Sequence, residues 1–461
     1  MMNILENKLT PLQEAVRAFS QSEEEKAGVP HIKNAYKGHV VNQLIENTLV
    51  NQAGEGFTHT RLNDRFGQMI NEAAGTGTPS INMTAGVKNY DPVLVKMVRR
   101  AVPQLMAFDL CGVQPLSQPT GLIFALRARY DTQTGAEALF DEARTNHSGA
   151  TAGTHAGDSS GFNKDFIKTG TPKENPKTGT GLLLSDAEVL GTTAGQAWAE
   201  MGLSIERTDV AAKSRKLKAT YTRELAQDMA SVHGLSVEDE LINVLSQQLV
   251  SEIDREVIRT INHSAVLGAK NTARPGIFDM VADSDGRFFA ERVKHLLFFI
   301  ETEANMIAKR TRAGRANRLI CSSNVASALK ILGLLEQNPA IAGGVAVDET
   351  KQTFAGVLMS QYQVWIDPYT EVDYITLGYK GESSWDAGIY YCPYIPVERY
   401  SAVGTDDFTQ KIGLSTRYGL VANPYFSTKS DGTQPTGKGL GQGENGYFAK
   451  FAVANLSYTS K

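Results

Sequence analysis

A long amphipathic helix is the feature that most constrains what this chain can fold into. Six apolar residues recur at four-residue steps between residues 237 and 262: Leu241, Leu245, Leu249, Ile253, Val257 and Ile261. This spacing predicts a helix about 39 Å long, at ~1.5 Å per residue, whose apolar stripe faces a core. Ser236 can cap its first turn, and the acids at 238–240 follow where the helix dipole favours negative charge. Leu245 and Ile253 lie in the middle of the stripe and are expected to be buried.

The rest of the chain mixes helical and strand patterns. A second helix is expected over 288–310, and residues 121–130 alternate like a strand that dips into an apolar layer. After residue 318 the sequence predicts a helix over 324–332. It also predicts strands over 319–322, 362–366, 374–379, 388–391, 397–400, 413–421 and 447–453. The expected fold class is therefore α+β, and 461 residues suggest about three domains.

Two regions depart from this pattern. Residues 131–196 are rich in Gly, Thr, Ser and Asn, and the large apolar residues between 149 and 181 are Phe162, Phe166 and Ile167. Such a segment cannot bury a core of its own, so we expect neighbours to order it.

Residues 1–72 carry charged, weakly amphipathic stretches, and two readings stay open: a loosely ordered tail, or helices that need a partner. Helical spacing occurs twice there, in Leu12, Val16 and Phe19 and in Val41, Leu44, Ile45 and Leu49. Residues 73–92 are small and polar and read as an extended arm, and a short helix is expected over 92–102.

Composition excludes several classes of protein. A formal net charge of −4 argues against a dedicated nucleic-acid binder, which would carry a basic domain or stripe. The apolar runs are far shorter than the ~18 residues of a spanning helix, and the N-terminus has no signal-peptide core. The isolated Cys111, Cys321 and Cys392 form neither a disulfide framework nor a metal knuckle.

The sequence contains no catalytic motif that we could identify. HExxH, GxSxG and GxxxxGK[ST] patterns are absent, and the histidines are scattered. The glycines near residue 440 follow no strand and precede no helix, so they do not make a dinucleotide-binding loop. We therefore expect no catalytic, metal or cofactor site, and the alternative of an enzyme would need titratable groups converging in a pocket.

One short pattern is concentrated at the N-terminus. The triplet Ile/Leu-x-Glu occurs five times, and four copies end at Glu6, Glu14, Glu46 and Glu72; the fifth ends at Glu336. Amphipathic helices place Leu and Glu at such offsets by chance, so the triplet alone is a weak signal.

Several longer stretches resemble the major capsid protein of T-even-like tailed phages. They are 97–115 (MVRRAVPQLMAFDLCGVQP), 119–127 (PTGLIFALR), 212–219 (AKSRKLKA), 224–228 (ELAQD), 354–358 (FAGVL), 386–391 (DAGIYY) and 416–419 (TRYG). The resemblance covers most of the chain from about residue 72. It implies an HK97-like fold with an N-terminal arm, an extended E-loop, a peripheral domain built on a long spine helix, and an axial domain.

The resemblance also implies domain boundaries. In order along the chain they are a propeptide or scaffold-binding segment at 1–72, an N-terminal arm at 73–120, an E-loop region at 121–200, a peripheral domain at 201–318 with its spine helix at 237–262, a mainly axial domain at 319–426, and a Gly-rich tail with a C-terminal strand at 427–461. The family typically carries an insertion domain after the E-loop, and the Gly/Thr-rich residues 148–198 imply that it is reduced or absent here.

A structural function follows from the resemblance. Such proteins form hexameric capsomers that build an icosahedral or prolate head around double-stranded DNA, without sequence-specific binding and without catalysis. The implied partners are further copies of the chain, vertex and portal proteins, an internal scaffold, a prohead protease, host chaperonin and decoration proteins. Assembly is expected in the host bacterial cytoplasm and the product in the virion. The alternative reading is the pentameric vertex protein of the same phages.

The resemblance gives the triplets a meaning, because a prohead protease of these phages cuts after Glu in Ile/Leu-x-Glu. The expected processing site is Ile70-Asn71-Glu72 followed by Ala73. Glu6, Glu14 and Glu46 would be secondary cuts in the released propeptide.

Overall fold

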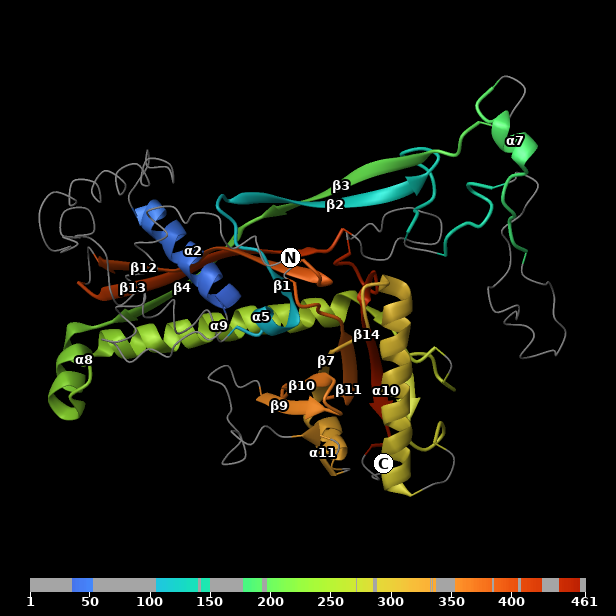
Figure 1. The fold of residues 1–461 in the computed structure, drawn as a ribbon. Helices are drawn as coiled ribbons and strands as arrows, with labels where there is room; N and C mark the ends of the chain where they lie inside the picture. Colours follow the sequence, from blue (N-terminus) through green and yellow to red (C-terminus); the bar gives the residue numbers. More distant parts are fainter. Residues whose placement is uncertain are drawn as a thin grey trace, which may run out of the picture. The chain divides into compact units, whose positions relative to one another are not determined.

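The computed structural model describes thirteen stretches of the chain, and its elements keep one numbering throughout (Figure 1). The stretches are 35–52, 105–139, 142–149, 177–192, 197–270, 272–284, 288–331, 333, 335–336, 353–383, 385–404, 408–424 and 439–456. Two compact units result: Met1–Ile123 with Thr208–Lys461, and Phe124–Arg207. The predicted helix over 92–102 and the anchors Phe162, Phe166 and Ile167 lie outside the described residues.

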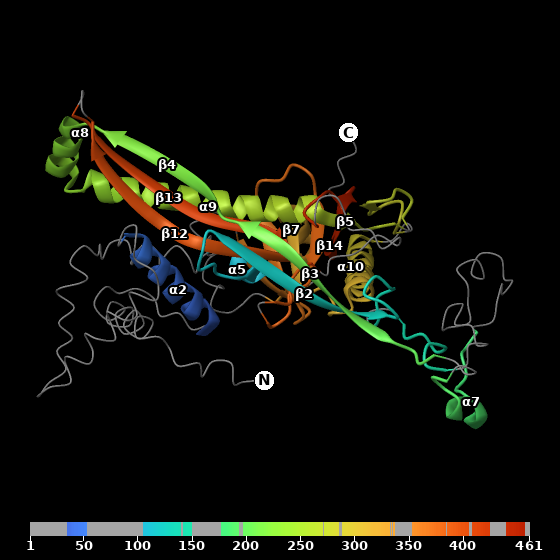
Figure 2. The same cartoon turned by 90° about the horizontal axis from the view of Figure 1, so that it is seen from above.

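The first unit contains a four-stranded sheet crossed by one long helix. The sheet runs β1(Gly112–Val113), β12(Ile389–Val403), β13(Gln410–Ala422), β4(Lys213–Tyr221), with β1 parallel to β12 and the other pairs antiparallel. Helix α9(Val237–Ser264) packs along β4 and β13, and both views show it beside them (Figure 2). At the end of β4, α8(Arg223–Asp228) continues into a π-helical turn, Met229–His233.

Helix α9 confirms the predicted helix and extends it by two residues. Ser236 Oγ accepts from the Asp239 amide at 3.4 Å, and acids occupy the first turn. The predicted stripe is only partly right, because Leu241 and Leu245 are half-buried. The fully buried apolar residues are Val237, Ile242, Leu249, Val250, Ile253, Val257, Ile258 and Ile261. A step of four residues turns about 400°, so a strict four-residue line drifts around the helix, whereas mixed steps of three and four stay on one face.

A second, larger sheet fills the rest of the first unit. Its order is β5(Ala265–Leu267), β14(Asn445–Ala454), β11(Tyr374–Gly378), β7(Arg318–Ser322), β10(Tyr362–Asp367), β9(Thr353–Leu358), β8(Leu335–Glu336), and β6(Ile277–Asp279) pairs with β14. Helix α10(Phe289–Thr311) packs on β14 and β11, and α11(Ser323–Ile331) on β7 and β10. The inward face of α10 buries Val293, Leu296, Ile300 and Ile307, whereas Leu297 is half-buried.

Strand β12 replaces two predicted strands. The sequence predicts separate strands over 388–391 and 397–400, and Pro393 and Pro396 lie between them. The structure instead continues through this stretch with register shifts after Pro393 and after Ile395. A bulge lets a strand absorb a residue that cannot donate to the ladder, which is why proline does not end it.

Seven of the strands were not predicted from the sequence: β1, β3(Met201–Ala211), β4, β5, β6, β8 and β9. Strand β3 does alternate, with apolar residues at 201, 203 and 205, so its signal was overlooked. Strand β4 is rich in charged residues, and the other five strands are only two to six residues long. Strand β4, with four Lys or Arg among its nine residues, lies at the edge of its sheet, where charged side chains are usual.

Helix α2(Ala35–Gln52) resolves the two readings of the N-terminal segment for the residues that are described. Val41, Leu44 and Ile45, predicted by their spacing, are at most 2% exposed and belong to the same buried cluster as α9, β1 and β12. This part of residues 1–72 is therefore a packed helix. Leu12, Val16 and Phe19 lie outside the described residues.

The second unit is built on a two-stranded ribbon. Strands β2(Thr120–Tyr130) and β3 pair with each other, and residues 136–138 add backbone contacts along β2. A short helix, α7(Leu184–Glu188), and the loop 142–149 complete the described part of this unit. A short α5(Ala107–Leu110) precedes β1 in the first unit.

Candidate assembly surfaces

The ribbon of β2 and β3 has two unlike faces. Alternate residues of a strand point to opposite sides, so each strand contributes one set of side chains to each face. One face carries Arg127 and Arg129 of β2 with Ser204 and Glu206 of β3. The other carries large apolar side chains.

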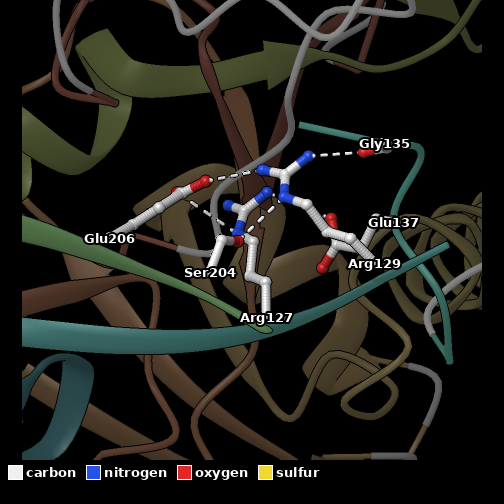
Figure 3. A network of polar contacts seen from close by, with 6 residues as sticks. All are labelled: Arg127, Arg129, Gly135, Glu137, Ser204 and Glu206. Atoms are coloured by element: carbon white, nitrogen blue, oxygen red, sulfur yellow. Dashed lines mark hydrogen bonds and ion pairs between the residues drawn. The ribbon is translucent and has the colours of Figure 1, made fainter. Parts of the chain in front are cut away.

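The charged face forms a closed network (Figure 3). Arg127, only 4% exposed, contacts Glu137 at 3.0 Å and Glu206 at 3.2 Å. Arg129 contacts Glu206 at 3.1 Å and donates to Ser204 Oγ at 2.8 Å and to the Gly135 carbonyl at 2.9 Å. Two guanidinium groups thus meet two carboxylates, which compensates the cost of burying each charge.

The turn after β2 depends on its glycine. The Gly135 amide donates to the Thr132 carbonyl at 3.0 Å, and a Cβ at this position would lie 1.9 Å from the Tyr130 carbonyl oxygen. Only glycine fits there, and its carbonyl is thereby held where Arg129 can reach it. The ring of His147 packs edge-on against Tyr130 at 4.6 Å, which anchors the following loop.

The opposite face of the ribbon is apolar and open to solvent. Its members in the second unit are 53–71% exposed: Phe124, Leu126, Met201, Leu203 and Ile205. The predicted strand is confirmed, but no described residue of the second unit forms an apolar layer over this face. Arg127 is buried and Arg129 half-buried on the opposite face, whereas the large apolar side chains are exposed. An exposed apolar patch of this kind marks an interaction surface.

A second exposed apolar group lies in the first unit, at the outer end of α9. Its residues come from α8, the π-helical turn and the residues that follow it, α9, the end of β12 and the loop before β13: Leu225, Val232, Leu235, Val244, Val403 and Phe408, each at least 47% exposed. Tyr221, Val237, Ile242 and Ile412 form a small buried cluster beneath them. The buried cluster fixes the shape of this end while the outer residues stay available.

A depression lined mostly by charged and polar residues runs along α9. Arg215 contacts Glu252 at 3.2 Å and Glu256 at 2.5 Å, and Arg255 contacts Asp367 at 2.6 Å. Although burial opposes it, hydrogen bonds to Glu256 and Tyr418 raise the pKa of Arg215. These cations are already paired with carboxylates of the chain, so the depression is a set of links between α9 and both sheets.

Among the described residues there is no group of three or more His, Cys, Asp or Glu side chains that could hold a metal ion. No described helix is long and apolar enough to cross a membrane. The processing residues Ile70, Asn71, Glu72 and Ala73 lie outside the described residues.

The charged network was not predicted from the sequence. The signal that could have indicated it is that Arg127 and Arg129 lie on the same face of a predicted strand.

Comparison with known proteins identifies the family to which this chain belongs. The profile of the family described as "Major capsid protein Gp23" matches residues 87–453. This chain belongs to the Gp23 family. The major capsid protein of Serratia phage KSP90 is 42% identical over 392 residues, covering 82% of this chain and 88% of that protein. That of Enterobacteria phage T4 is 33% identical over 465 residues, covering 86% and 89%.

Gp23 membership makes the chain a major capsid protein, a structural subunit of the head shell of a tailed phage, and not a member of an enzyme class. The vertex-protein alternative is the weaker one. The capsid vertex protein of Escherichia phage AR1 is only 25% identical, over half of this chain.

The fold class is α+β and HK97-like, as the resemblance implied. The solved capsid of Myoviridae Phage XM1 aligns with 76% of this Gp23 chain and 92% of its own at 9% identity, with a TM-score of 0.39. A score of this size adds nothing to the assignment, which rests on family membership and on the elements described above.

Proposed function

We propose that this Gp23 chain forms hexameric capsomers whose contacts use the apolar face of the β2–β3 ribbon, and that these tile an icosahedral or prolate head around double-stranded DNA. The exposure of Phe124, Leu126, Met201, Leu203 and Ile205 on one face carries the proposal. A two-stranded ribbon alone is marginally stable in water, and a second layer packed over its apolar face would stabilise it. In a shell made of many copies, a neighbouring copy supplies that layer.

A pair of variants tests this use of the ribbon. Phe124→Ser combined with Leu203→Ser removes two large apolar side chains without touching the charged face. Arg207→Ser is the matched control, because Arg207 is an exposed residue of the same strand face. Electron microscopy of particles made in the presence of the scaffold should show shells with the control and unassembled subunits with the double variant. Shells of normal shape from a double variant with unchanged circular dichroism would contradict the proposal.

We further propose that a prohead protease removes residues 1–72 by cutting between Glu72 and Ala73. Three features support this site: the Ile70-Asn71-Glu72 triplet, the small residues that follow, and the change in composition there. The fifth triplet ends at Glu336 in β8, which pairs with β9, and Leu335 is only 7% exposed. Backbone held in a ladder cannot enter a protease cleft, so this triplet would survive.

Mass spectrometry of the major head protein from mature virions tests the cut. A chain that spans residues 73–461 is expected. A chain that begins at Met1 or Met2 would show that this lineage matures without cleavage.

The remaining proposals concern partners and place. Residues 1–72 would bind the internal scaffold, and the shell would join vertex and portal proteins, with decoration proteins outside. Host chaperonin would assist folding in the bacterial cytoplasm, where the head assembles. DNA would be enclosed without sequence-specific contacts and the subunit would carry no catalysis, which agrees with a net charge of −4 and with the paired state of the charges along α9.

A further inference from the structure

Helix α2 occupies the core of the first unit rather than its surface. Four successive inward residues are almost completely buried, with exposures of 0–2%: Val40, Val41, Leu44 and Ile45. They share one buried cluster with Phe108 of α5, Val113 of β1 and Tyr391 of β12. A segment that merely tethered the subunit to a scaffold would not need to fill the interior of its own chain.

The buried Asn47 ties α2 to a bulge in β12. Its side-chain amide donates to the Leu116 carbonyl at 2.7 Å and to the Tyr394 carbonyl at 2.9 Å. Tyr394 is skipped by the ladder, since Pro393 pairs with Tyr418 and Ile395 with Arg417. One donor from α2 thus joins the carbonyl of Leu116, which follows β1, to that of Tyr394 in β12, across what we call the β1–β12 junction. Half-buried carbonyls that lose a donor are destabilised.

The first turn of α2 holds the other side of the same junction. Lys37 contacts Asp109 of α5 at 3.2 Å and lies 5.5 Å from the centre of the Phe108 ring. The Tyr36 hydroxyl donates to the Val113 carbonyl of β1. Helix α2 thus contacts α5, β1 and β12 with both apolar and polar groups.

We propose that α2 is a removable part of the subunit core, which holds α5 and β1 against β12 before processing and whose departure after a cut between Glu72 and Ala73 loosens that junction. The release of α2 depends on the proposed processing. Its role in holding α5 and β1 against β12 is a property of the uncut chain. Loss of α2 would leave the Leu116 and Tyr394 carbonyls without their amide donor and would open the apolar cluster. Processing would then change the interior of each subunit as well as its length.

The clamp also sets an order of cleavage. Glu46 follows the buried Leu44 and Ile45 in the middle of α2, so the backbone of its triplet is helical. A protease needs extended, accessible backbone. The cut at Glu46 would therefore occur only after α2 has left, and thus after the cut at Glu72.

An engineered cut tests the clamp independently of the natural protease. Residues 70–73 are replaced by the recognition sequence of a specific protease in the full-length chain, which is cleaved and passed through gel filtration to remove residues 1–72. Thiol labelling then compares Cys111, at the end of α5, with Cys321 and Cys392, which lie in other buried clusters. We expect Cys111 to react at least tenfold faster after the cut, with Cys321 and Cys392 unchanged. A fragment that stays bound, or Cys111 labelling that does not change, would overturn the proposal.

A substitution in the uncut chain tests the clamp by itself. Asn47→Ala removes the amide that bridges Leu116 and Tyr394, and Asn42→Ala is the control, because Asn42 is a half-buried residue of the same helix with no hydrogen bond to another described residue. The amides of Gln114 and Leu116 donate to β12 at 2.9 Å, so their hydrogen exchange reports on the junction. We expect about tenfold faster exchange at both amides in Asn47→Ala alone. Equal exchange in the two variants would refute the clamp even if the natural cut at Glu72 is later demonstrated, and a demonstrated clamp would stand without that cut.

Discussion

At the scale of single residues, the charged face of the ribbon depends on the balance of two arginines and two glutamates. Glu206 is the shared partner, because it contacts both Arg127 and Arg129. Glu206→Ala leaves two guanidinium groups with one carboxylate, and breaking a buried ion pair costs about 3–5 kcal/mol. We expect hydrogen exchange in β2 and β3 to accelerate by at least roughly 100-fold, since ~1.4 kcal/mol is a factor of ten. Glu188→Ala, in the exposed helix α7, is the control, and similar exchange in both variants would show that the network does not hold the ribbon.

The three cysteines give a pH dependence at the same scale. Burial raises the pKa of each thiol, Cys111, Cys321 and Cys392, from 9.0 to about 12. Because the unfolded chain releases these protons near pH 9 and the folded chain does not, stability should fall as the pH rises from 9 towards 12. Replacing all three by Ala should flatten this part of the curve, which thermal unfolding at several pH values can measure. Rapid labelling of any of the three thiols in the uncut native chain at pH 8 would contradict their burial.

At the scale of elements, α9 shows how a helix is fixed by what it packs against. Leu249 lies in a small cluster with Val397 of β12 and Leu414 of β13, whereas Leu245 packs at the margin of the same cluster and is half-buried. Leu249→Ala should lower the free energy of unfolding by about 2–5 kcal/mol, and Leu245→Ala by clearly less, because less area is lost from water. Chemical denaturation of the two variants measures the difference. Equal losses would mean that both side chains are equally buried.

The β2–β3 ribbon is the opposite case, because its apolar face has little packing against described residues of its own subunit. Strand β2 was predicted from its alternation and is confirmed, but the alternation did not indicate which face lies inside. Apolar residues alternate with small and charged ones, and a single subunit would be expected to bury the apolar set. Here the apolar set is outside because the layer that covers it comes, in our proposal, from another copy.

At the scale of the whole molecule, we expect assembly to protect segments that are exposed in a single chain. The described parts of the loop between β2 and β3, 142–149 and 177–192, are mostly exposed. Their amides, and those of residues 135–195 in general, should exchange fast in unassembled subunits and slowly in the shell, whereas α9 should be protected in both. Hydrogen exchange followed by mass spectrometry compares the two states. Equal protection in subunit and shell would show that the E-loop region is ordered without neighbours.

The sequence by itself determined the local elements and the family. The capped helix at α9, the helix at α10 and most strands after residue 318 followed from spacing and caps, because periodicity and hydrogen-bonding residues act over a few positions. The stretches shared with T-even-like capsid proteins identified the Gp23 family, since long matches do not depend on packing.

The tertiary structure decided which groups meet. Two separate strands were predicted over 388–391 and 397–400, but pairing with β13 on both sides of Pro393 continues β12 as one bulged strand. Arg127 is buried beside Glu137, ten residues along the chain, and Glu206, which comes from the other strand of the ribbon and also contacts the half-buried Arg129. Asn47 reads as an ordinary polar residue of an amphipathic helix, and its two carbonyl partners lie 69 and 347 positions away along the chain. Such contacts are set by long-range packing, which spacing along a single chain does not encode.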